Sequence, residues 1–215
     1  MSPSVEETSY SPERFAYWYF RLNGFLTTEN FIIHPDTGSN QRTDADLLAV
    51  RFTRRLENLV VPMEDDPRVA ECSTSVNIVI AEIKRGLCSL NGPWTDRESE
   101  NMKRALKAIG CVHDESLSTA CDQLYDRGYW SDGLVTIRLF AVGNKRAPGL
   151  CMPDEQQLTW SEMIQFCVKR FKHYRRQKSS VGQWTEDGRR LRDDSLSKFP
   201  SEAIRLSFEL PMKAH

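Results

Sequence analysis

Two segments decide the fold, TDADLLAV at residues 43–50 and IVIAEIK at residues 78–84. Each joins an apolar run, the pattern of a buried strand, to charged residues at one end of that run. Asp46 opens the first run, and Glu82 and Lys84 close the second. Charge is costly on a buried strand unless it is paired or binds a metal ion. We therefore expect the three side chains to meet at the ends of neighbouring strands and to form a divalent-cation site beside an ammonium group.

Alternation along a strand decides which of these side chains share a face. Residues two apart point to the same side, so Glu82 and Lys84 face one way and Ile83 the other. Asp44 and Asp46 share a face for the same reason. We prefer Asp46 as the metal ligand because it immediately precedes the apolar run, and Asp44 remains the alternative. An exposed ion pair at a strand end is the competing interpretation of Glu82 and Lys84.

The composition fits one folded domain with elaborations. The chain has 215 residues, of which 40% are hydrophobic and 10% aromatic, which is enough for a core. Its formal net charge of -1 does not exclude a nucleic-acid partner, because positive charge can be clustered. No apolar stretch has the length of a membrane span, residues 1–7 do not resemble a secretory signal, and the six cysteines form no C-x-x-C pair. We expect a reduced, cytoplasmic protein without a membrane partner.

Periodicity predicts four strands, preceded by a helix that opens after Ser11 and ends at Asn23-Gly24. More helices are expected between the third and fourth strands. This order predicts an α/β fold in which a central mixed four-stranded sheet is flanked by helices, an αβββαβ core. The strands are expected at residues 30–34, 44–52, 76–83 and 134–142, with an irregular insertion at 54–75.

Three later helices are expected from their end signals. The sequence from Thr95 to Glu98 has the form of a capping box, and the helix that it opens is expected to end at Gly110. A second helix is expected to end near Gly128. Beyond a Gly/Pro break, a third begins near Thr159 or Ser161.

Four pieces of the chain carry a resemblance to a known superfamily. They are Glu13, the Gly24-Phe25 pair, the run 44–49 and the run 81–84. Their order resembles the PD-(D/E)XK, or restriction-endonuclease-like, nucleases, and most closely the small resolvase-like members. The resemblance covers about the first two thirds of the chain. The Pro35-Asp36 pair lies in a turn cluster, and we do not assign it to the motif.

The resemblance implies a Mg²⁺-dependent nuclease, with Mn²⁺ as a substitute, that hydrolyses DNA, and a homodimer is a further expectation. Asp46 and Glu82 would bind the metal with the main-chain carbonyl of Ile83. Lys84 would orient the attacking water or stabilise the transition state. Glu13 would support the metal-bound water, or is simply an acid suited to a helix N-terminus. The alternatives are an RNA nuclease and a non-catalytic nucleic-acid-binding or scaffold protein that retains the fold.

A basic run near the end of the last helix is the second functional signal. Clustered lysine and arginine can bind the backbone phosphates of a nucleic acid. The competing interpretation is a solvated helix end whose cations suit the helix dipole. The run belongs to a helical C-terminal extension, residues 147–215, which follows the nuclease-like core at residues 1–146. The candidate DNA-binding residues are Lys169, Arg170, Lys172, Arg175, Arg176 and Lys178.

Overall fold

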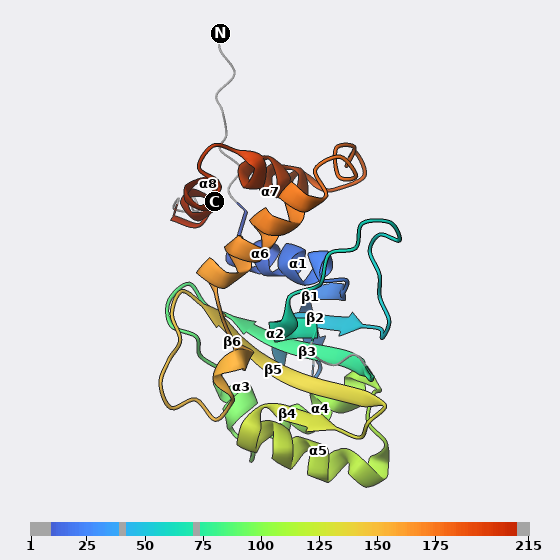
Figure 1. Cartoon of the computed structure of the whole chain (residues 1–215). Helices are drawn as coiled ribbons and strands as arrows, with labels where there is room; N and C mark the ends of the chain where they lie inside the picture. The colour runs from blue at the N-terminus through green and yellow to red at the C-terminus, as the bar shows by residue number, and fades with distance from the viewer. Residues whose placement is uncertain (1–9, 39–41, 71–73, 210–215) are drawn as a thin grey trace.

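A mixed β-sheet forms the centre of the computed structural model, which describes residues 10–38, 42–70 and 74–209 (Figure 1). Within these residues the sheet has six strands in the order β1-β2-β3-β5-β4, and β6 pairs with β5. The first three are antiparallel neighbours, whereas β3 and β5 run parallel. The strands are β1 (Leu26–Ile33), β2 (Thr43–Arg51), β3 (Val76–Ile83), β4 (Tyr129–Ser131), β5 (Val135–Gly143) and β6 (Gln157–Thr159).

The predicted α/β class and mixed sheet are confirmed, with two strands more than expected. The additional strands, β4 and β6, have three residues each. Alternation needs a longer segment to be visible, so the sequence pattern could not indicate them. β1 is also longer than expected, because it begins at Leu26 rather than at Asn30.

Helices cover both faces of the sheet (Figure 1). α1 and α6 lie on one face and share a core with Leu47, Val79 and Phe140. α4 and α5 lie on the other face, in a core that includes Ile80 and Leu139. α7 and α8 pack outside α6. The helices are α1 (Pro12–Leu22), α2 (Pro67–Ala70), α3 (Gly92–Thr95), α4 (Asn101–Ile109), α5 (Asp114–Arg127), α6 (Trp160–His173), α7 (Glu186–Leu196) and α8 (Pro200–Glu209), with a 3-10 turn at Asp154–Gln156.

The end signals of several helices are confirmed. Ser11 caps α1, since its side chain accepts the Arg14 N–H at 3.2 Å. Gly110 and Gly128 end α4 and α5 in the left-handed conformation, with φ of 72° and 65°. Thr159 caps α6 through a complete capping box.

The prediction of a capping box at Thr95 is wrong. Thr95 is the last residue of the short helix α3, and α4 begins only at Asn101. The Thr95 hydroxyl donates to the carbonyls of Asn91 and Gly92, at 3.4 and 3.3 Å. Pro93, in the first turn of α3, starts this helix early and leaves Thr95 at its end.

The C-terminal extension closes one face of the sheet. Trp160 of α6 contacts Phe15 of α1 with ring centroids 6.2 Å apart, and Phe166 contacts Tyr19 at 5.5 Å. These residues belong to the same core as β2, β3 and β5. The elements that precede residue 147 and the C-terminal extension therefore share one hydrophobic interior. Among the described residues, no helix is both long and apolar enough to cross a membrane.

Candidate active site

The site is located where β2 and β3 stop pairing. Their last pair at this end is Leu47 with Ala81, so Asp46 and Glu82 face each other one step further along. There the main-chain N–H of Ile83 donates to the Asp46 carboxylate, Oδ2, at 2.7 Å. Beyond the last backbone pair, the Asp46 side chain thus takes the place of a β2 main-chain carbonyl as the acceptor for β3. This hydrogen bond fixes the carboxylate beside the backbone of Glu82 and Ile83.

The ladder between β1 and β2 is also interrupted at Asp46. Pairing runs as far as Glu29 with Leu47 and resumes at Phe31 with Ala45, which omits Asn30 and Asp46. Asn30 has φ of 50°, a left-handed conformation that asparagine tolerates better than most residues. The sheet is therefore irregular on both sides of Asp46. Backbone in a sparsely populated conformation costs free energy and persists only where the surrounding structure holds it. Such residues are often found at functional sites.

Glu82 is buried, with only 2% of its surface exposed, and three donors surround its carboxylate. The Lys84 ammonium and the Asn91 side-chain amide both donate to Oε1. The Trp94 indole N–H donates to Oε2 at 3.0 Å. The carboxylate is therefore held in a fixed orientation, with the lysine side chain against it.

Asn91 and Trp94 are site residues that the sequence analysis did not assign. Their segment, Asn-Gly-Pro-Trp, has the form of a turn with a packing tryptophan. α3 starts directly after Asn91 and orients both side chains toward Glu82. The available signal was position, because this turn follows β3 and Lys84 closely and has two side chains that can donate to a carboxylate.

The two acids and the lysine form one electrostatic cluster. Burial raises the pKa of Asp46, while the Ile83 N–H and the charge of Lys84 lower it. Glu13 and Asp44 raise it further by like-charge repulsion. Glu13, at the start of α1, is therefore near enough to influence Asp46, and Asp44 is a neighbour of the same carboxylate.

Glu82 responds to the same surroundings. Burial raises its pKa, the hydrogen bond from Lys84 lowers it, and the charge of Asp46 raises it. The hydrogen bond from Trp94 lowers it as well. The repulsion that raises the pKa of Glu82 would be relieved by a positively charged ligand between the two acids.

Two hydrogen bonds define the orientation of the backbone at Ile83. Its N–H points toward β2, while the N–H of Lys84 points toward β5 and donates to the carbonyl of Val142 at 2.9 Å. The N–H and C=O of one strand residue point toward the same neighbouring strand. The Ile83 carbonyl therefore lies on the Asp46 side of β3, while its side chain is in the core with α1.

This donor set suits Mg²⁺ better than a transition metal. The oxygen donors are the carboxylates of Asp46 and Glu82 and the carbonyl of Ile83, and no His or Cys contributes. Mg²⁺ prefers oxygen, takes one or two carboxylates and keeps several waters. In the described part of the chain, no group of three or more His, Cys, Asp or Glu side chains is arranged to hold a metal. A cation here would be bound by two acids, main chain and water.

Two of the six candidate DNA-binding residues are structural, which corrects that assignment. Arg170 has a side chain with 0% exposure and forms ion pairs with Glu57 at 2.5 Å and Asp65 at 2.6 Å. Lys178 forms an ion pair with the same Glu57 and lies 5.7 Å from the ring centroid of Trp184. Both fasten the end of α6 to the segment before β3. A buried, ion-paired arginine cannot reach a phosphate.

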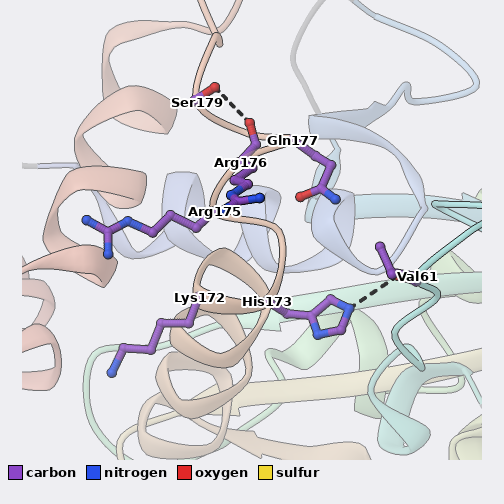
Figure 2. A pocket seen from close by; sticks show the side chains of 7 residues that line it. All are labelled: Val61, Lys172, His173, Arg175, Arg176, Gln177 and Ser179. Carbon is purple, nitrogen blue, oxygen red and sulfur yellow. Dashed lines mark hydrogen bonds between the residues drawn. The ribbon is translucent and has the colours of Figure 1, made fainter.

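The other four cations, Lys169, Lys172, Arg175 and Arg176, are exposed. Within the described ranges none of them forms an ion pair. Three of the four line a hollow at the end of α6, in which Lys172 and Arg175 extend to one side of the helix (Figure 2).

This basic surface lies far from the acidic site. α6 begins after β6, which pairs Leu158 with Val142, and Val142 is the neighbour of Lys84. From there the helix runs 14 residues, about 20 Å at 1.5 Å per residue. Its far end is tied to Asp65, which also pairs with Arg51 at the opposite end of β2, at 2.9 Å. The acidic and basic sites are at opposite ends of the sheet.

Comparison with protein-family models, curated proteins and solved structures gives no match for this chain, so its interpretation rests on its own residues and geometry.

Proposed function

We propose that this chain is a metal-dependent nuclease with a restriction-endonuclease-like core, and that it hydrolyses phosphodiester bonds in DNA. The observation that carries the proposal is the meeting of Asp46, Glu82 and Lys84 where β2 and β3 separate. The element order also supports it, because a helix, three antiparallel strands, helices and a parallel strand occur in the sequence expected of that core.

Each residue has a role that follows from its contacts. A bound Mg²⁺ would lower the pKa of a water molecule and neutralise charge on the phosphate. Asp46, fixed by the Ile83 N–H, keeps its second carboxylate oxygen for the cation. Asn91 and Trp94 hold the Glu82 carboxylate in place. Lys84, held against Glu82, would orient the attacking water or donate to a phosphate oxygen.

The competing interpretation, a structural ion pair, accounts for Lys84 and Glu82 but not for Asp46. Among the described residues Asp46 has no salt-bridge partner, and the charges of Glu13 and Asp44 repel it. A half-buried acid in such surroundings lowers stability. Residues that lower stability in this way are typical of sites kept for function.

The direct test is cleavage by the purified protein in Mg²⁺ or Mn²⁺. We offer duplex, single-stranded and branched DNA, and the same forms of RNA, and quench parallel reactions with a chelator. Metal-dependent cleavage of at least one DNA form is expected. Cleavage of RNA alone would reassign the substrate. A folded protein that cuts none of these polymers would support the non-catalytic alternative.

Metal binding can be measured without cleavage. Mn²⁺ is expected to raise the melting temperature of the wild-type protein, because a ligand that binds only the folded state stabilises it by about 2.7 kcal/mol at a hundredfold excess over Kd. Asp46→Asn is expected to abolish this shift. Asp44→Asn is the matched control and is expected to keep most of it. The reverse pattern would make Asp44 the ligand.

Asp46→Asn is also expected to stabilise the metal-free protein at neutral pH. The folded-state pKa of Asp46 lies above its ordinary value because of burial. Protonated Asp46 therefore contributes a stability that is fully present below its ordinary, unfolded-state pKa. This contribution is lost as pH rises through the raised pKa of the folded state. Asparagine keeps an oxygen to accept the Ile83 N–H and removes the buried charge. Thermal melts in chelator should show a gain at pH 8 that shrinks toward pH 4, and an equal gain at both would contradict this account.

A further inference from the structure

A cluster of exposed apolar side chains follows β2. Leu59 and Val60 are 87% and 86% exposed, and Phe52, Leu56 and Val61 are exposed as well. Five large exposed apolar residues fall within ten positions, and exposed apolar side chains that gather on a surface often mark an interaction site. We call residues 56–61 the apolar loop.

Hydrogen bonds and ion pairs hold the apolar loop in shape. The Asn58 side-chain oxygen accepts the N–H groups of Val60 and Val61, both at 2.9 Å. The His173 ring contacts the carbonyl of Val61 at 3.2 Å, a contact visible in Figure 2. At the start of the loop, Glu57 is held by Arg170 and Lys178. Leu59 and Val60 are therefore presented at the tip of a braced loop, and ordering them for binding costs little entropy.

Positive charge lies next to this tip. The hollow at the end of α6 has a volume of about 820 Å³, and no Asp or Glu lines it. His173 and Gln177 extend toward the Val61 side, and Arg176 lies between them and Arg175 (Figure 2). Arginine, lysine, amide and hydroxyl groups are the side chains that contact phosphate and sugar in nucleic-acid complexes. The lining residues are Val61, Lys172, His173, Arg175, Arg176, Gln177 and Ser179.

We propose that the apolar loop and this hollow form a second DNA-contacting surface, separate from the candidate active site. The cations would hold the phosphate backbone, and Leu59 and Val60 would enter a base step as an aliphatic wedge. The preferred DNA is one with a step that is already weakly stacked, such as a bulge or a branch point, because opening that step costs less. The choice of DNA rests on the proposed function, whereas the surface requires neither the metal nor cleavage.

The length of α6 can be compared with the length of a DNA duplex. α6, which leads from the β6 end of the sheet to the hollow, is about 20 Å long. A duplex advances about 3.4 Å per base pair along each strand. A duplex that follows the length of this helix extends over about six base pairs.

The test measures binding by the full chain carrying Lys84→Ala, in chelator, to a fluorescent duplex of about 30 base pairs with or without a central bulge. Arg175→Gln with Arg176→Gln is expected to weaken binding about tenfold or more and to reduce the salt slope by about two, since two phosphate contacts are lost. Leu59→Ser with Val60→Ser is expected to remove the preference for the bulge and to leave the salt slope unchanged. The matched control, Lys103→Gln with Lys107→Gln on α4, removes two exposed cations elsewhere and should change neither quantity.

Two outcomes would overturn the proposal. The first is an unchanged affinity and salt slope in the arginine variant. The second is a preference for the bulge that is unchanged in the Leu59→Ser with Val60→Ser variant. If either result is accompanied by binding to vesicles of phosphatidylserine and phosphatidylcholine that depends on Leu59 and Val60, the surface is assigned to an anionic membrane. Neither outcome affects the nuclease proposal, which the cleavage assay and the Mn²⁺ melting shift test separately.

Discussion

Lys84→Ala is expected to reduce metal-dependent DNA cleavage by at least about 10²- to 10³-fold, the usual effect of removing one group that stabilises developing charge. In the structure the ammonium lies against Glu82, at the end of β3 and within the electrostatic reach of Asp46. Its loss removes the positive charge that would orient the attacking water. Single-turnover cleavage at saturating Mg²⁺ measures the effect, with circular dichroism to verify folding.

The matched control is Lys107→Ala. Lys107 is an exposed lysine of α4 whose ion pair with Asp114 is also exposed, so its removal should alter neither fold nor rate appreciably. If Lys84→Ala retains wild-type cleavage while the control behaves as expected, Lys84 is not the catalytic lysine. The role of the whole E-x-K segment would then have to be abandoned.

Arg170→Ala is expected to destabilise the protein by about 3 kcal/mol, toward the lower end of the range for breaking a buried ion pair. The side chain is inaccessible to solvent, pairs with Glu57 and Asp65, and donates to the carbonyls of Met63 and Glu64. Its removal leaves a cavity and two main-chain acceptors without their donor. The loss is moderated because other arginines remain on the two acids, including Arg51 and Arg55 on Asp65 and Arg55 on Glu57.

Arg175→Ala is the control, five residues further along the chain. Arg175 is exposed and lines the hollow at the end of α6. Its replacement should change the free energy of unfolding by no more than about 0.5 kcal/mol. Urea denaturation of both variants gives the comparison, and equal effects would refute the division of the basic run into buried and exposed members.

The basic run shows how far a sequence pattern can distinguish exposed cations from buried ones. Lysine and arginine near a helix end predict a positive surface, and four of the six residues are exposed. Arg170, however, falls on the apolar stripe of α6 with Met163, Phe166 and Cys167. That spacing is visible in the sequence, but the acids that make burial tolerable, Glu57 and Asp65, are more than a hundred residues away. Only the tertiary fold brings them together.

The two T-x-x-E sequences make the same point for local structure. Thr159 with Glu162 forms a complete capping box, whereas Thr95, with Glu98, ends a helix instead of opening one. The T-x-x-E signal is identical at both places. The difference comes from Pro93, which starts α3 before Thr95, and from the contact of Trp94 with Glu82, which helps to fix α3 in place. The strand β3 was predictable because its apolar run is short and rich in Val and Ile, which favours a buried strand over a helix.

The irregular backbone at Asn30 also affects how the molecule meets its own copies. β1 is an edge strand of the described sheet, and its exposed side chains include Leu26 and Ile32. An unbroken edge of this kind is a template on which a strand of another molecule can add. The left-handed turn at Asn30 divides the edge into two short pieces, one of four residues and one of three. We therefore expect the irregular pairing beside Asp46 to disfavour strand-to-strand aggregation.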